Sequence, residues 1–387
     1  MAHRIVVLGA GYAGLTAARR LADGFRRGDV RITLVNATPE FVERVRLHQT
    51  AAGQQIRPWP LRDSLRDTGI ELLVGRVVAV DPVAREVRLD DGRTTGYDKL
   101  VYALGSTDDD SVPGVAEHAL KVAGHGGAVL AGARIAELAA AKGTVAVVGG
   151  GATGIEAAAE LAESHPDLRV RMLVGPELGA QFSRRGREHV QRVFDRLGIE
   201  VRAGAQVGEV RSDHLVLSGG GTVEADAALW TAGFRVSPLA AESGVECDER
   251  GRIVVDPTMR SVSHPDVYAI GDAARARSGN GTELRMSCAT GLPMAMRAAK
   301  SIIAELGGAT PAPMWFRYFN LCVSLGRRDA LIQFLNADDS PRPAVLTGRT
   351  AVLYKEAIVR GAAWVVRRSP RLWSRQRVPA AARSHAA

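Results

Sequence analysis

The sequence has few cysteines and no pair of them at close spacing. Only Cys247, Cys288 and Cys322 occur among 387 residues, and none forms a Cys-x-x-Cys motif. A two-electron relay through a disulfide needs two adjacent thiols, so this chemistry is disfavoured. Each cysteine is expected to be a small buried hydrophobe or a loop residue, and no metal site is expected.

Long apolar runs are also missing. No run approaches the ~18 residues that a transmembrane helix needs, and the first residues pass directly into an apolar strand without a signal-peptide pattern. The predicted location is therefore the cytoplasm. Hydrophobic residues make up 46% and charged residues 24% of the chain, which is typical of a globular protein, and the length allows two or three domains.

Most of the chain lacks an excess of either charge. The net charge is +8, but residues 342–387 hold ten Lys or Arg and a single acid, while residues 1–341 hold 40 basic and 41 acidic side chains. A neutral body does not suit nucleic-acid binding. No nucleic-acid partner is expected, and the basic excess belongs to the C-terminal tail.

A glycine fingerprint occurs twice. Residues 9–14 read GAGYAG and residues 149–154 read GGGATG, each after an apolar run and before an Ala-rich segment. A strand, a glycine turn and a helix N-terminus present free N–H groups and a helix dipole to a pyrophosphate. One copy is weak evidence, but two copies in this context predict two bound dinucleotides.

The repeat extends beyond the glycines. Each fingerprint is followed by a second strand, a run of short alternating strands and an apolar strand that ends in glycine. In the first copy these segments are 31–36, 86–89 and 100–105; in the second they are 169–175, 214–217 and 228–233. The recurrence in the same order predicts two copies of one α/β domain.

A third pattern follows the second copy. Residues 264–272 read HPDVYAIGD, and a helix is expected over 291–306. Asp272 has two interpretations, as an acceptor for ligand hydroxyls or as the cap of a turn. The pattern alone does not choose between them.

Together these motifs resemble the FAD-dependent pyridine nucleotide–disulfide oxidoreductase superfamily over about residues 1–310. The motifs are GAGYAG, YALG, GGGATGIE, TAGF and YAIGD. The resemblance implies an α/β fold with two Rossmann-like domains of the three-layer ββα type, in which the NAD(P)H domain is inserted in the FAD domain. The predicted FAD domain is 1–109 and 256–310, the NAD(P)H domain 110–255, and the C-terminal region 311–387.

The resemblance also implies the cofactors, FAD and a co-substrate that is NADH or NADPH. Asp272 would lie near the FAD ribityl–phosphate region, and the following helix would direct its N-terminus, with Ala289, at the flavin pyrimidine edge. Cys288, just before this helix, is the cysteine of most interest. The residues predicted to bind FAD are Gly9, Gly11, Tyr12, Ala13, Gly14, Asn36, Arg46, Gly105, Asp272 and Ala289. Those predicted to bind NAD(P)H are Gly149, Gly151, Thr153, Gly154, Gly175, Arg184 and Gly233.

The choice between NADH and NADPH depends on the end of the second strand in each copy. An acidic residue usually binds the ribose there, and this sequence has Asn36 in the first copy and Gly175 in the second. Asparagine can still bind a ribose. Gly175 removes repulsion against a 2′-phosphate, which Arg184 and Arg185 could pair with, unless they are solvated surface arginines.

Candidate catalytic side chains are few, because hydride transfer from nicotinamide to flavin needs no protein acid or base. Glu156 follows the second fingerprint, and in the resembling enzymes the matching glutamate lies where nicotinamide and flavin meet. Its alternative role is to stabilise a helix N-terminus. The segment 41–49 adds Arg46 and His48 as candidates to contact the flavin or the acceptor.

The C-terminal part resembles type II NADH dehydrogenases, which are non-pumping NADH:quinone oxidoreductases. One departure is that these enzymes have glutamines at the start of the flavin-facing helix, where this chain has Thr290 and Met294. Threonine can still donate a hydrogen bond to a carbonyl, and methionine cannot. Thr290 is therefore the third catalytic candidate.

Two interpretations remain open for the apolar segment 352–366, a membrane-surface helix or a helix docked on the body. For residues 367–377, which mix arginines with Trp373, contact with an anionic membrane surface is favoured. The protein would then be peripheral on the inner face of a membrane. The sequence does not indicate an oligomeric state.

The predicted function is that of an FAD-dependent NAD(P)H oxidoreductase that passes electrons to a quinone or quinone-like small molecule. Three alternatives remain: a reductase of a protein carrier such as ferredoxin, a sulfide:quinone-type enzyme that uses Cys288 and Cys322, and a redox sensor resembling apoptosis-inducing factor.

Overall fold

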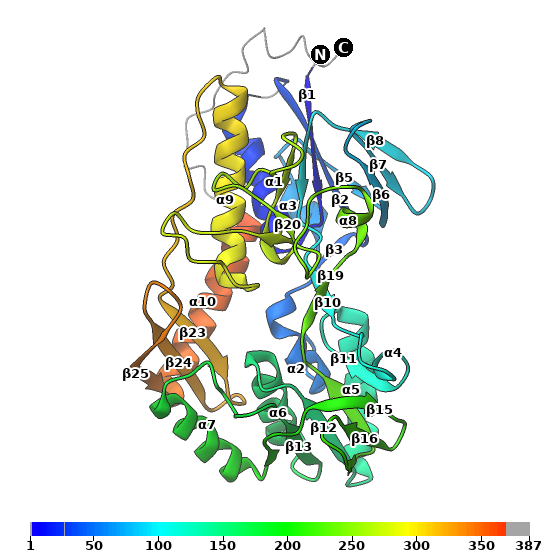
Figure 1. Ribbon diagram of the computed structural model, residues 1–387, viewed down its shortest axis with the longest axis vertical. Coiled ribbons are helices and arrows are strands. Elements are labelled where there is room, and N and C mark those ends of the chain that lie inside the picture. The colour runs from blue at the N-terminus through cyan, green and yellow to red at the C-terminus, as the bar shows by residue number, and fades with distance from the viewer. Residues whose placement is uncertain (1, 27, 369–387) are drawn as a thin grey trace.

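The structure is a computed structural model that describes residues 2–26 and 28–368. Figure 1 shows two α/β units stacked along the long axis of the molecule, with the C-terminal region lying along one side of both. Each unit contains a five-stranded parallel sheet.

The upper unit is built on apolar strands that are buried on both faces, as parallel strands usually are. Its sheet has the order β21-β9-β1-β2-β5. The strands are β21 (Val267–Ala269), β9 (Lys99–Tyr102), β1 (His3–Leu8), β2 (Val30–Asn36) and β5 (Ile70–Val74). Two helices and an antiparallel three-stranded sheet share its core. They are α1 (Tyr12–Gly24), α9 (Cys288–Leu306), β6 (Val77–Asp81), β7 (Glu86–Leu89) and β8 (Thr94–Gly96).

The lower unit repeats this arrangement, with the parallel order β11-β18-β12-β13-β14. Its strands are β11 (Ala119–Lys121), β18 (Ala227–Trp230), β12 (Thr144–Val148), β13 (Arg169–Leu173) and β14 (Glu200–Arg202). Its helices are α5 (His125–Ala140), α6 (Ala152–Ser164) and α7 (Arg184–Leu197), and its antiparallel sheet is β15 (Val207–Val210), β16 (His214–Leu217) and β17 (Thr222–Glu224). All of it lies between β9 and β21 of the upper unit in sequence. The predicted fold class, with one α/β domain inserted in another, is confirmed.

The chain enters and leaves the lower unit through two paired strands. The strands are β10 (Ser106–Asp108) and β19 (Phe234–Val236), and they form an antiparallel pair between the units. The predicted boundaries at 109/110 and 255/256 lie close to this connection and remain predictions.

The C-terminal region is a small antiparallel sheet followed by one long helix. The sheet contains β23 (Asn320–Ser324), β24 (Ala330–Leu335) and β25 (Pro341–Thr347), and α10 spans Gly348–Arg368. Val323 and Leu331 of the sheet belong to the core of the lower unit, whereas Val366 of α10 belongs to the core of the upper unit. This region therefore connects the two units.

The segment 352–366 is thus part of a docked helix, with Leu353, Ile358 and Trp364 exposed on its outer side. Residues 369–377 lie outside the described residues. None of the helices described is long and apolar enough to cross a membrane. The remaining short elements are β3 (Glu40–Phe41), η1 (Arg44–Arg46), α2 (Leu47–Ala51), β4 (Trp59–Pro60), α3 (Leu61–Leu65), α4 (Val115–His118), α8 (Leu239–Glu242), β20 (Ile253–Val254), η2 (Gly271–Ala273) and β22 (Ala274–Arg275).

Candidate active site

The first glycine fingerprint forms the turn between β1 and α1. Gly9 has a φ of +92°, which favours glycine, and a Cβ on Gly14 would overlap the Gly9 carbonyl oxygen. A Cβ on Gly11 would meet no atom within 4 Å. No side chain caps α1 and its first turn has no acidic residue, so its N–H groups remain available to an anion.

The second fingerprint has the same geometry between β12 and α6. Gly149 has a φ of +120°, a Cβ on Gly154 would overlap the Gly149 carbonyl, and Gly151 has open space within 4 Å. The N-terminus of α6 likewise has no side-chain cap and no acid in its first turn, and Thr153 lies in this turn. Both turns therefore fit a pyrophosphate, and the residues present suit a dinucleotide in each unit.

Several predicted FAD residues surround the first turn. The Asn36 Oδ1 accepts a hydrogen bond from the Ala10 backbone N–H at 2.9 Å, which fixes the turn against the end of β2. The Tyr12 ring packs edge-on against Phe41, with ring centroids 5.0 Å apart, and its buried hydroxyl has no partner among the described residues. Asn36 and Tyr12 thus lie beside the turn, and their contacts with FAD remain predictions.

The start of α9 lies next to this turn. The Ala13 Cβ lies 3.3 Å from the position of a Cβ on Gly271, and Asp272 accepts a 2.7 Å hydrogen bond from the Ser106 hydroxyl. Ala289 is exposed, but Thr290 is buried. The Thr290 hydroxyl donates to the carbonyls of Arg285 and Ser287, both at 2.9 Å. It serves the start of the helix in this structure, and its catalytic role remains a prediction.

Of the other predicted NAD(P)H residues, Gly175 and Gly233 follow strands β13 and β18, whereas Arg184 begins helix α7. Gly175 follows β13, and a Cβ there would meet nothing within 4 Å. Arg184 is 84% exposed and lies 3.7 Å from Glu188. Gly105 and Gly233 have positive φ at +68° and +82° and flank the two connecting strands. Arg202, on β14 opposite Leu173, is a further basic residue near Gly175 that the sequence did not indicate.

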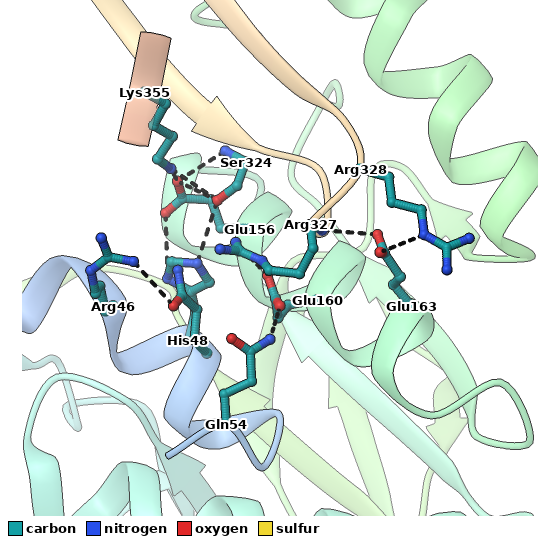
Figure 2. A network of polar contacts seen from close by, with 11 residues as sticks. Arg46, His48, Gln54, Glu156, Glu160, Glu163, Ser324, Arg327, Arg328 and Lys355 are labelled. Atoms are coloured by element: carbon teal, nitrogen blue, oxygen red, sulfur yellow. Dashed lines mark hydrogen bonds and ion pairs between the residues drawn. The ribbon is translucent and has the colours of Figure 1, made fainter. Parts of the chain in front are cut away.

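A buried polar cluster lies where α2, α6, β23 and α10 meet (Figure 2). The Lys355 ammonium donates hydrogen bonds to the Glu156 carboxylate and, at 2.9 Å, to the Ser324 hydroxyl. Ser324 also donates to Glu156 through its backbone N–H at 3.1 Å. The His48 Nδ1 lies 3.8 Å from the same carboxylate, and its Nε2 lies 3.4 Å from the Ser324 hydroxyl.

Electrostatics fixes the charges in this cluster. Burial raises the pKa of Glu156, but the Lys355 ammonium and the neighbouring His48 outweigh burial, so the pKa lies below its usual range. Burial lowers the pKa of His48 to about 4, against the opposing effect of Glu156. Near neutral pH, Glu156 is therefore a carboxylate and His48 a neutral imidazole.

The structure brings Glu156 and His48 together, and it places Arg46 at the edge of the same cluster. Arg46 forms an ion pair with Glu356 of α10 at 2.6 Å and with Glu43 at 3.2 Å. The sequence analysis missed Ser324 and Lys355, which complete the cluster. The available signal was the pair Lys355 and Glu356 within a mostly apolar stretch of a helix.

Comparison with known proteins agrees with the presence of two dinucleotide-binding glycine turns. The sequence profile of the family described as pyridine nucleotide-disulphide oxidoreductase matches residues 3–300. The chain belongs to this family. An NADH dehydrogenase-like protein of Mycobacterium tuberculosis is 34% identical over 324 residues, which cover 78% of this chain and 80% of the relative.

Two further proteins are informative. A type II NADH:quinone oxidoreductase of Mycobacterium tuberculosis is 31% identical and covers 82% of this chain and 76% of its own length. The crystal structure of sulfide:quinone oxidoreductase from Aquifex aeolicus shares the fold, with a TM-score of 0.80 at 22% identity, over 96% of this chain and 93% of that chain.

Membership of the pyridine nucleotide-disulphide oxidoreductase family confirms the predicted family, the cofactors and the enzyme class. The protein is an FAD-dependent NAD(P)H dehydrogenase. The similarity to the NADH dehydrogenase-like branch is confirmed as well.

Proposed function

We propose that the enzyme oxidises NADH or NADPH and reduces a quinone or a quinone-like small molecule. The observation that carries this proposal is the buried cluster of Glu156, His48, Ser324 and Lys355, in which α6, α2, β23 and α10 meet. Relatives named for quinone reduction support the same acceptor class.

The stoichiometry of the reaction requires a source of protons. NAD(P)H supplies two electrons and one proton as a hydride, and reduction of a quinone to a quinol consumes two electrons and two protons. One proton must therefore come from the protein or from water. The first glycine turn, with Asn36 beside it, would hold FAD, which would supply the two-electron relay between NAD(P)H and the acceptor.

The cluster can hold and deliver this proton. The Lys355 ammonium holds a proton between Glu156 and Ser324, and loss of it to an acceptor oxygen leaves a neutral amine beside a carboxylate. Glu156 stabilises the ammonium before the transfer and attracts a replacement proton afterwards. The neutral His48 adds a hydrogen-bonding group without adding a second positive charge.

The thiols do not favour the sulfide:quinone-type alternative. Cys322 lies on β23 two residues before Ser324, and burial raises its pKa to about 11. A cysteine attacks a sulfur atom as the thiolate, and at neutral pH the Cys322 side chain is a thiol. The pKa of Cys288, the other thiol of that alternative, is likewise raised to about 11, by desolvation and by the Asp272 carboxylate.

Use of NADPH beside NADH is part of the proposal. Gly175 leaves open space at the position where an acid would repel a 2′-phosphate. Arg202 at the end of β14, or the exposed Arg184 and Arg185 at the start of α7, would pair with this phosphate.

We also propose that the enzyme is peripheral on an anionic membrane surface. The exposed Leu353, Ile358 and Trp364 lie on the outer side of α10, and residues 342–387 carry a net charge of +9. Apolar side chains flanked by basic ones suit the interface of an anionic bilayer.

A panel of acceptors tests the proposed function. The holoenzyme is given NADH or NADPH without oxygen and then a water-soluble quinone, an acidic ferredoxin or sulfide with quinone. The proposal predicts rapid quinone reduction without sulfide. Rapid reduction of ferredoxin and no reduction of quinone would contradict it.

A further inference from the structure

The turn between β23 and β24 contacts two helices, α6 and α2. Gly326, with a φ of +81°, lies so close to α6 that a Cβ would overlap the Glu163 carboxylate. The next residue, Arg327, donates its backbone N–H to Glu163 at 2.9 Å. The turn is thus held against α6 by its backbone.

The Arg327 side chain extends this contact to α2. Its Nε and Nη2 lie 3.0 and 2.7 Å from the Glu160 Oε2 (Figure 2). With the Gln49 carboxamide oriented so that its oxygen faces the guanidinium, that oxygen accepts from Nη1 at 2.9 Å. One guanidinium thereby joins the C-terminal sheet to α6 of the lower unit and to α2, whose Ala51 belongs to the core of the lower unit.

Glu160 is fully buried, with 0% exposure. Its second carboxylate oxygen accepts a hydrogen bond from Gln54, which follows α2. A buried carboxylate is costly without a cation, and Arg327 is the cation beside it. Burial raises the pKa of Glu160, and Arg327 and Gln54 only partly oppose this effect.

The contacts of Arg327 with Glu160 and Gln49 form what we call the tie. Each of these three residues lies close in sequence to a residue of the buried polar cluster. Glu160 is one helical turn after Glu156 on α6, Gln49 directly follows His48 on α2, and Arg327 is three residues after Ser324. A shift of the tie would therefore move three of the four cluster members relative to Lys355.

We propose that Arg327 is a positioning residue, which sets the geometry of Glu156, His48 and Ser324 by joining α2 and α6 to the β23–β24 turn. This inference rests on the proposed function of the cluster. A misplacement of about 1 Å at a reacting group can lower a rate on the order of a hundredfold.

The test compares Arg327→Met, which removes the guanidinium but keeps an apolar stem, with Arg328→Met. Arg328 is the matched control, because it lies in the same turn and is 86% exposed, and its one ion pair within the described part of the chain is with Glu163, at 3.7 Å. Arg327→Lys keeps a cation near Glu160 and provides a second variant if Arg327→Met does not fold.

Quinone reduction by the FAD-loaded variants gives the first result. We expect kcat to fall about tenfold or more in Arg327→Met with little change in the KM for NADH, a smaller fall in Arg327→Lys, and none in Arg328→Met. In a Glu156→Gln background, Arg327→Met should cost less than about twofold, because its effect passes through Glu156. Equal losses in the two backgrounds would overturn the inference.

Hydrogen exchange separates this inference from the proposed function. Faster exchange in α2 and α6 in Arg327→Met, but not in Arg328→Met, supports the tie even if Glu156→Gln leaves quinone reduction unchanged, which would refute the proposed role of Glu156. Unchanged exchange in Arg327→Met would overturn the positioning role.

Discussion

His48 and Glu156 lie 3.8 Å apart in one buried cluster, yet their protonation states are set by different surroundings. Lys355 keeps Glu156 ionised, whereas no carboxylate contact is close enough to keep His48 protonated against the cost of burial. At neutral pH the cluster therefore holds a Glu156 carboxylate and a neutral His48 imidazole.

The pKa of His48 predicts a loss of stability in acid. The unfolded chain binds a proton on this residue below pH 6.5, and the folded chain does so only near pH 4. Stability is thus fully present above pH 6.5 and falls as the pH drops, by up to about 3 kcal/mol at pH 4. Denaturant unfolding at pH 7, 6, 5 and 4 should show a flatter profile for His48→Gln. Identical profiles would show that folding does not lower the pKa of His48.

Gly175 predicts the choice of co-substrate. An acid at this position would have space for its side chain and would repel a 2′-phosphate. NADPH should reduce the wild-type flavin at a rate within about a hundredfold of NADH, a barrier difference below roughly 3 kcal/mol, and Gly175→Glu should shift the preference toward NADH. Stopped-flow absorbance with each nucleotide measures this. If NADPH is inert with the wild type and the variant behaves the same, Gly175 does not select the nucleotide.

At the scale of elements, the two glycine turns have the same steric roles but should serve different nucleotides. Gly11 and Gly151 have ordinary φ angles of −69° and −74° and open space beside them. Alanine there should leave the apoprotein as stable as the wild type, while its methyl group competes with the ligand.

Gly11→Ala should therefore weaken FAD binding, and Gly151→Ala should weaken only NAD(P)H binding, each by about 1–3 kcal/mol. Fluorescence titration of the apoprotein with FAD, and of the holoenzyme with NADH, gives the two affinities. Each variant is the control for the other. Equal FAD affinity in both variants would contradict the assignment of the first turn to FAD.

The turns could be predicted from sequence because their geometry is local. A positive φ at Gly9 and the close approach at Gly14 are set within six residues of chain, and so is the helix start that follows. Thr290 was harder, because a threonine hydroxyl can donate either to a ligand or to nearby carbonyls, and its pattern does not choose between them; here it donates to the carbonyls of Arg285 and Ser287. The exposure of Arg184 depends similarly on how α7 packs.

At the scale of the whole molecule, the site depends on contacts that no local pattern encodes. Glu156 and Lys355 are 199 residues apart in the chain, and α10 reaches Glu156 only because β23 to β25 dock on the lower unit. The sequence could thus predict Glu156 and His48 as single candidates, but it could not predict Lys355 and Ser324 as their partners.

The C-terminal charge predicts binding to anionic vesicles. Each basic residue near such a surface contributes about 1 kcal/mol, and salt screens the attraction. The protein should co-sediment with phosphatidylglycerol vesicles at low salt and dissociate at high salt. Removal of residues 369–387 should weaken binding but preserve the fold, because it retains Arg367, whose guanidinium lies 4.7 Å from the Trp59 ring centre.

Phosphatidylcholine vesicles are the control for this measurement. Equal binding to neutral and anionic vesicles, or unchanged binding after the truncation, would contradict an electrostatic contact through the C-terminal residues.

The central claim is that Lys355 and Glu156 deliver a proton to the acceptor. The most direct measurement is the turnover of FAD-loaded Lys355→Met with NADH, using a quinone and ferricyanide as alternative acceptors. Ferricyanide takes up electrons but no protons. We predict that quinone turnover falls on the order of a hundredfold or more, while ferricyanide turnover stays within about twofold of wild type. An equal fall with both acceptors, or no fall with the quinone, would contradict the account.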